Sequence, residues 1–212
     1  MFKLDEQYLK NLKAFIGKEI RIYSLENGIE FYHDIELQYR LIELSLNHYE
    51  LQIIERGKIA WKTSYDNKSE TEMKRELALI LRGYFGAGMP DFGLAREKFK
   101  SIENKNLTKL DELMSMYVGN DFYSINNPQE WKINFDLSQT GEYDIYFLCK
   151  NGTKIERGKV GPISIFSKFC LEARYLKESL ERINQYQKFF SEHLQDDEIE
   201  YLLYRKDIKN RN

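Results

Sequence analysis

The chain is poor in the residues that build most recognisable metal and catalytic sites. It has two cysteines, three histidines and three prolines among 212 residues. Two thiols without a nearby third ligand do not form a zinc site, and Cys149 and Cys170 both stand in apolar runs that are typical of buried free thiols. We therefore expect no metal, and a reducing cytoplasm is the compartment that fits two unpaired cysteines.

Long apolar runs are also missing. No segment approaches the roughly 20 apolar residues of a membrane span, and the amino-terminal residues 1–6 contain no apolar signal core. Hydrophobic residues make up 42% of the chain, which predicts a globular protein rather than a disordered one. We expect no association with a membrane.

Neither sign of charge dominates the chain. The formal net charge is −2, and residues 1–90 contain 13 Lys or Arg against 14 Asp or Glu. Proteins that bind nucleic acid usually present a basic face, so the sequence argues against a nucleic-acid partner. Aromatic residues are abundant at 14%, with 15 tyrosines, and tyrosine suits both half-buried strands and protein interfaces.

No catalytic constellation is visible in the sequence. His33, His48 and His193 have no acidic or thiol neighbour at metal-site spacing, and no nucleophile elbow accompanies them. The glycine-rich residues 83–93 follow a predicted helix and lack the Lys-Ser/Thr ending of a phosphate loop, so they are predicted to form a hinge or a packed loop. We predict no catalytic residue and no cofactor. A Ser-His-Asp site assembled from distant residues stays open.

Two stretches of the chain share one pattern. Residues 49–59 and 143–155 both open with Tyr, an acidic residue and an apolar run, and both contain a turn with a basic residue and a glycine. Each stretch is followed by helical periodicity, over about residues 70–85 and 164–190. The pattern predicts two copies of a β-hairpin followed by a helix.

The same plan extends to the rest of the chain. A helical pattern over residues 5–16 and further strand patterns repeat the order helix, antiparallel strands, helix, which predicts an α+β fold of two related modules packed together. The glycines and Pro90 of residues 83–93 are the strongest breakers of regular structure. We therefore predict a first α+β module over residues 1–90 and a second over residues 91–212.

Local signals indicate several element ends. Asn27-Gly28 predicts a tight turn, because this pair accepts positive φ cheaply. Ser69 is placed to cap the helix that follows it. The buried face of that helix is predicted to carry Met73, Leu77, Ile80, Leu81 and Tyr84.

Acidic residues gather in two places. One group begins a predicted last helix, where acids favour the positive end of the helix dipole: Asp196, Asp197, Glu198 and Glu200. The other group belongs to the first predicted sheet: Glu30, Asp34, Glu36, Glu43 and Glu50. An acidic face would speed the capture of a basic partner and would weaken with salt. Scattered, solvated charges are the alternative.

The first hairpin carries a family resemblance. Residues 49–63, with Glu55-Arg56-Gly57-Lys58 at the turn, resemble the central hairpin of a bacterial immunity-protein family of polymorphic toxin systems (immunity protein 63-like). Residues 77–85 and 92–99 fit the same layout. The resemblance implies a protein that binds a cognate toxin inside the producing cell and blocks it, without catalytic residues. The second repeat departs from the pattern at residues 150–152.

These observations lead to one principal hypothesis and two alternatives. The principal hypothesis is a non-catalytic, cytoplasmic immunity protein that occludes its toxin through aromatic anchors and a charged rim. The residues predicted to bind the toxin are Glu55, Arg56, Trp61 and Tyr65, although core packing is the alternative role for Trp61. A hydrolase with an unrecognised site and a structural or regulatory adaptor are the other hypotheses. The sequence leaves the oligomeric state open.

Overall fold

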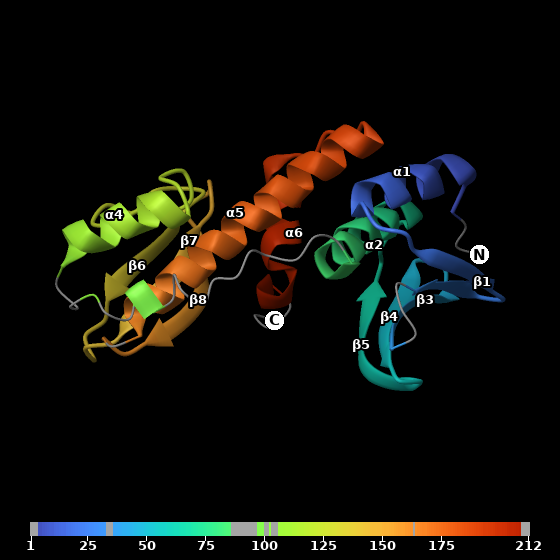
Figure 1. Ribbon diagram of the computed structural model, residues 1–212, viewed down its shortest axis with the longest axis horizontal. Helices are drawn as coiled ribbons and strands as arrows, with labels where there is room; N and C mark the ends of the chain where they lie inside the picture. The colour runs from blue at the N-terminus through green and yellow to red at the C-terminus, as the bar shows by residue number, and fades with distance from the viewer. Residues whose placement is uncertain are drawn as a thin grey trace. The chain divides into compact units, whose positions relative to one another are not determined.

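The computed structural model describes residues 4–32, 36–85, 97–99, 102, 106–162 and 164–208. Helices and two antiparallel sheets, of five and three strands, make up an α+β fold, as the sequence predicts (Figure 1). The chain divides into two compact units. Unit 1 comprises Met1–Gly88 and Gln185–Glu192, and unit 2 comprises Met89–Asn184 and His193–Asn212. Most of residues 83–93, where the sequence places the module boundary, lie outside the described residues.

Unit 1 contains a five-stranded antiparallel sheet whose strands follow their order in the chain. The strands are β1 (Arg21–Leu25), β2 (Gly28–Tyr32), β3 (Leu37–Ser45), β4 (His48–Glu55) and β5 (Lys58–Asp66). Successive side chains point to opposite faces of such a sheet. One face is apolar and includes the fully buried Phe31, Tyr39 and Leu41. The other face carries most of the sheet's polar residues.

Two helices of unit 1 lie over the apolar face, α1 (Glu6–Ile16) and α2 (Glu70–Phe85) (Figure 1). The ring centroid of Phe85, at the end of α2, is 4.9 Å from that of Tyr39 on β3. Ser69 caps α2, as predicted: its hydroxyl accepts a hydrogen bond from the Glu72 amide at 3.2 Å, and the Glu72 carboxylate accepts one from the Ser69 amide at 2.8 Å. This reciprocal capping box satisfies backbone groups that the helix itself leaves unpaired.

Unit 1 takes a further helical segment from far along the chain. The residues of α5 (Ile165–Phe190) from Gln185 onward belong to this unit. Ring centroids lie 5.2 Å apart for Tyr8 and Phe190, and 5.9 Å apart for Phe15 and Tyr186. The core of unit 1 therefore includes side chains from the end of α5, although residues 89–184 of unit 2 separate them from the unit 1 sheet in the sequence.

Unit 2 contains a three-stranded antiparallel sheet and helices. Its elements are α4 (Leu107–Tyr117), β6 (Ile133–Leu137), β7 (Tyr143–Leu148), β8 (Lys154–Val160), the larger part of α5, and α6 (Asp196–Ile208). The opposite residues Ile133 and Phe147 are fully buried on one face of the sheet. On that face α5 contributes Phe169, whose ring centroid is 4.9 Å from that of Phe135.

Both repeated segments form a hairpin, β4–β5 and β7–β8, and each hairpin is followed in the chain by a helix. Both hairpins contain a register shift, at Ile53/Ile54 and at Ile145/Tyr146. Their turns differ, because Arg56 and Gly57 alone connect β4 to β5, whereas residues 149–153 connect β7 to β8. A longer connection is consistent with the departure of the second repeat at residues 150–152.

Two local predictions are wrong in detail. Asn27 forms the β1–β2 turn with Glu26, but neither Asn27 nor Gly28 adopts a positive φ. Glycine is needed at position 28 for a different reason: a Cβ there would lie 2.2 Å from the carbonyl oxygen of Leu41. Tyr84 contacts the core but is not buried: its ring centroid is 5.1 Å from that of Tyr39, and the residue is 59% exposed.

Candidate functional site

The β4–β5 hairpin of unit 1 ends in a two-residue turn. Arg56 and Gly57 have φ values of 49° and 77°, as in a type I′ turn, whose twist matches that of the flanking strands. Glu55 and Lys58 stand opposite each other and close the hairpin. The Arg56 guanidinium lies 3.7 Å from the carboxylate of Glu36, and both side chains are mostly exposed.

A β-bulge beside this turn separates two apolar side chains. Ile59 pairs with Ile54, but Trp61 pairs with Ile53, so Ala60 is the extra residue. Because opposite residues share a face and consecutive residues do not, Trp61 belongs to the helix-covered face and Ile59 to the polar face. Their side chains are 40% and 54% exposed. The edge of the sheet therefore presents an apolar side chain on each face.

Three of the four residues predicted to bind a partner lie together at this end of the sheet. Glu55 and Arg56 are exposed at the turn, and Trp61 follows on β5. Together with Ile59 they form what we call the hairpin patch. Tyr65 is only 5% exposed, so it belongs to the core of unit 1 and is not available as a surface anchor. Sequence reasoning missed Ile59, because nothing in the strand pattern signals the bulge.

On the polar face of the same sheet, two carboxylates pair with basic side chains of neighbouring strands. Glu30 is buried and accepts hydrogen bonds from Arg40. Glu50 lies 3.1 Å from the ammonium group of Lys62, and hydrogen bonds from Gln52 and Lys62 lower the pKa of Glu50. These two carboxylates are engaged within the sheet and do not form the free acidic face that the sequence suggested.

Three of the four acidic residues at the start of α6 are also engaged. Asp196 pairs with the Lys150 ammonium, and Glu200 accepts a hydrogen bond from the Lys150 amide at 3.0 Å. Glu198 accepts one from the Gln195 amide at 3.0 Å. Glu198 therefore caps the start of α6, and Asp196 and Glu200 hold the β7–β8 loop. Asp34, from the other acidic group, lies outside the described residues.

The histidines do not assemble a metal site in the described part of the chain. His48 Nδ1 lies 2.7 Å from Asp66 Oδ1 on the polar face of the unit 1 sheet. His193 is exposed, and His33 lies outside the described residues. Among the residues that the structure describes, no three His, Cys, Asp or Glu side chains are grouped to hold a metal ion.

The two cysteines are buried free thiols, as predicted. Burial raises the pKa of Cys170 to about 12. Burial, together with the nearby Glu200 carboxylate, raises the pKa of Cys149 to about 12 as well. Since the thiolate is the reactive form of cysteine, neither side chain is a nucleophile near neutral pH.

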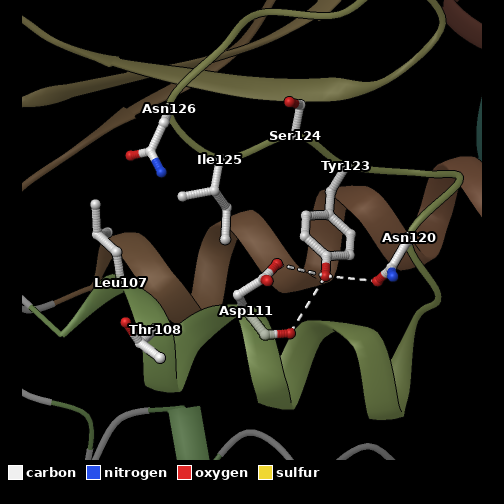
Figure 2. Close-up of a pocket in the computed structure, with 8 residues that line it drawn as sticks. All are labelled: Leu107, Thr108, Asp111, Asn120, Tyr123, Ser124, Ile125 and Asn126. Carbon is white, nitrogen blue, oxygen red and sulfur yellow. Dashed lines mark hydrogen bonds between the residues drawn. The ribbon is translucent and has the colours of Figure 1, made fainter.

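Unit 2 has a polar hollow of about 350 Å³ beside α4 (Figure 2). Its lining residues are Leu107, Thr108, Asp111, Asn120, Tyr123, Ser124, Ile125 and Asn126. They include no histidine, so the hollow does not supply the histidine-containing pocket that a hydrolase with His33 or His48 would need.

Hydrogen bonding at Tyr123 shows what this hollow can do chemically. The Tyr123 hydroxyl lies 2.8 Å from Asp111 Oδ1 and 2.9 Å from Asn120 Oδ1 (Figure 2). A phenolic hydroxyl has one hydrogen to donate, so lone pairs of these oxygens remain for a ligand with N–H or O–H donors. Burial and the neighbouring Asp111 raise the pKa of Tyr123, so its hydroxyl stays protonated and does not act as a base.

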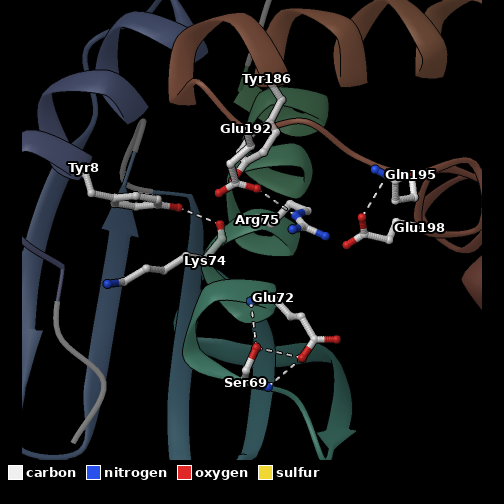
Figure 3. A network of polar contacts seen from close by, with 9 residues as sticks. All are labelled: Tyr8, Ser69, Glu72, Lys74, Arg75, Tyr186, Glu192, Gln195 and Glu198. Carbon is white, nitrogen blue, oxygen red and sulfur yellow. Dashed lines mark hydrogen bonds and ion pairs between the residues drawn. The ribbon is translucent and has the colours of Figure 1, made fainter.

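A second polar cluster lies in unit 1, between α2 and the end of α5 (Figure 3). Arg75 Nε is 3.0 Å from Glu192 Oε2, and the Tyr186 hydroxyl donates to Glu192 Oε1 at 2.9 Å. The Tyr8 hydroxyl donates to the carbonyl oxygen of Lys74 at 2.6 Å. Burial and Glu192 raise the pKa of Tyr186, so the Tyr186 hydroxyl stays protonated. The contacts of this cluster join α2 to the end of α5.

No protein-family model, curated protein or solved structure matches this chain. The resemblance to immunity proteins therefore depends only on the sequence features given above, the hairpin of residues 49–63 and the layout of residues 77–85 and 92–99. In the described part of the chain, every helix is too short or too polar to cross a bilayer.

Proposed function

We propose that this protein is a non-catalytic, cytoplasmic binding protein that neutralises a cognate bacterial toxin by occluding it. The observation that carries the proposal is the hairpin patch, in which Ile59 and Trp61 are exposed beside the charged residues Glu55 and Arg56. The resemblance of the same hairpin to immunity proteins supplies the class of partner.

The composition of the hairpin patch suits a protein interface. Trp and Arg are enriched among the residues that dominate binding energy, and they act best where an apolar centre is ringed by polar groups. Trp61 supplies an apolar anchor on the helix-covered face and Ile59 a second one on the opposite face, with Glu55 and Arg56 at the turn beside them. Truncating such an anchor typically costs about 2 kcal/mol or more of binding free energy, which is roughly a 30-fold loss of affinity.

The described polar groups favour binding over chemistry. The pKa values of Tyr123, Cys149 and Cys170 are all raised, which keeps these groups protonated. A hydrolase needs a general base or nucleophile that can be deprotonated near neutral pH, and these three groups do not supply one. The adaptor alternative fits the same hairpin patch but predicts a partner that is not toxic.

The proposal is tested by toxicity and rescue. Proteins that co-purify with the full chain from its native host are identified by mass spectrometry, and each is then expressed in a bacterial host with and without the full chain. We expect one of them to arrest growth alone and to be harmless when the full chain is present. Partners that are all harmless alone would contradict neutralisation and favour an adaptor.

A matched pair of variants locates the contact. Trp61→Ala removes the anchor, and Tyr23→Ala removes an aromatic side chain that is 51% exposed on β1, the other edge of the same sheet. We expect Trp61→Ala to lose growth protection and Tyr23→Ala to keep it, with both variants folded by circular dichroism. Protection by Trp61→Ala at the wild-type level would place the contact elsewhere.

A further inference from the structure

β5 is the longer of the two edges of the unit 1 sheet. It has nine residues, against five in β1, and among the described strands it has a neighbour on one side only. Every residue of β5 except Thr63 and Tyr65 is exposed. The edge of a sheet is where an incoming strand can pair through backbone N–H and C=O groups.

Charge on an edge strand normally discourages such pairing, but both lysines of β5 lie beside acidic residues of β4. The Lys62 ammonium lies 3.1 Å from Glu50, and Lys58 stands directly opposite Glu55. The β5 edge therefore offers little net charge, and a charged incoming strand gains no advantage over a neutral one.

The bulge at Ala60 makes this edge apolar from both sides. A strand laid beside β5 would bring alternate side chains next to Trp61 on one face and next to Ile59 on the other. Apolar side chains on both faces of the incoming strand would cover these two residues, whereas a wholly polar strand would leave them wet. From Trp61 onward β5 keeps a regular register with β4, so pairing can continue along the edge past the bulge.

We infer that the partner is captured by strand addition. An extended, electrically neutral segment of the partner, with apolar side chains on both faces, pairs along Lys58–Thr63 and covers Ile59 and Trp61. The inference takes the existence of a protein partner from the proposed function, and adds how it binds and what chemistry its binding segment has. Because the contact is apolar and the local charges are compensated, its affinity is insensitive to salt, unlike that of an acidic docking face.

A phage-displayed library of random dodecapeptides, selected against the immobilised full chain, tests this mode without knowledge of the toxin. We expect the enriched peptides to be near-neutral and rich in β-branched and aromatic residues. Dissociation constants of labelled synthetic copies, measured by fluorescence polarisation, should rise roughly tenfold or more in Trp61→Ala. They should change by less than about twofold in Tyr23→Ala and on raising the salt concentration.

Hydrogen exchange separates strand addition from a contact made by side chains alone. Adding an enriched peptide should slow amide exchange in β5 and leave β1 unchanged, because only the paired edge gains hydrogen bonds. The inference is overturned if no peptide is enriched, if the peptides have helical periodicity or strong charge, or if Trp61→Ala binds them normally.

The two proposals fail in different ways. If selected peptides protect the β5 amides but no partner is toxic in the rescue assay, toxin neutralisation is contradicted and strand addition is supported. If neutralisation depends on Trp61 but the toxin does not protect the β5 amides, the proposed function is supported and strand addition is contradicted.

Discussion

The carboxylate of Glu192 lies 3.0 Å from the guanidinium of Arg75, although 117 positions of the chain separate them. The two side chains are 28% and 13% exposed, and the Tyr186 hydroxyl donates to the second carboxylate oxygen. Both oxygens of Glu192 are therefore engaged inside unit 1. The ion pair joins α2 to the residues just after α5, and the ring contacts of Tyr8 and Phe15 join α1 to the end of α5.

Removing the cation of this pair should destabilise the protein. Breaking a fully buried pair costs about 3–5 kcal/mol and an exposed pair about 0–1 kcal/mol, so the partial burial here gives an expected loss of roughly 1–3 kcal/mol for Arg75→Ala. Urea unfolding followed by circular dichroism measures the loss. Lys109→Ala, which breaks an exposed pair with Glu112, is the control. Equal losses of stability for the two variants would show that the Arg75–Glu192 pair stabilises the protein no more than an exposed ion pair does.

Gly28 should not tolerate a side chain. A Cβ at this position would lie 2.2 Å from the carbonyl oxygen of Leu41, which is backbone of the neighbouring strand and cannot rotate away. We expect Gly28→Ala to lower the free energy of unfolding by roughly 1–3 kcal/mol or more. In Gly161→Ala the added Cβ meets no atom within 4 Å, so this control should unfold at the wild-type urea concentration. Equal stability of Gly28→Ala would mean that β2 can move away from β3 freely.

Glu50 should contribute stability only above acidic pH. Hydrogen bonds from Gln52 and Lys62 lower the pKa of its folded carboxyl, so the folded state binds fewer protons than the unfolded state, whose glutamate pKa is about 4.3. Its contribution is therefore present above that value and is lost as the pH falls through the folded pKa. We expect Glu50→Gln to cost about 1–2 kcal/mol at pH 7 and less near pH 3.

Urea unfolding at the two pH values tests this dependence. The control is Glu142→Gln, at an exposed position between β6 and β7, which should cost little at either pH. A loss for Glu50→Gln that is the same at both pH values would show that the carboxylate charge is not what stabilises the sheet.

Features set by neighbouring residues could be predicted from the sequence. The Ser69 cap of α2, the α5 periodicity and the Arg56-Gly57 turn depend on side chains a few positions apart, so a short stretch of sequence contains the whole signal. The burial of Cys149 and Cys170 followed in the same way from the apolar runs around them. The α+β class then follows from the order of the elements.

Features set by distant residues could not be predicted. The Arg75–Glu192 pair joins two residues that are 117 positions apart in the chain, and no periodicity relates them. The bulge at Ala60 involves neither glycine nor proline, so the strand pattern gave no reason to expect Ile59 on the polar face. The depth of Tyr65 depends on the layer packed over the sheet, which alternation alone does not reveal.

Tyr65 and Trp61 should therefore separate in experiment, although the sequence assigned them the same role. Tyr65 is 5% exposed, so Tyr65→Ala should leave a cavity and lower the free energy of unfolding by roughly 3–5 kcal/mol. Trp61 is 40% exposed, so Trp61→Ala should cost less stability than Tyr65→Ala and act mainly on partner binding. Urea unfolding gives the stability of each variant, and growth rescue gives its binding. Tyr65→Phe keeps the ring and should retain rescue. Loss of rescue by a stably folded Tyr65→Phe, with rescue intact in Trp61→Ala, would reverse the two assignments.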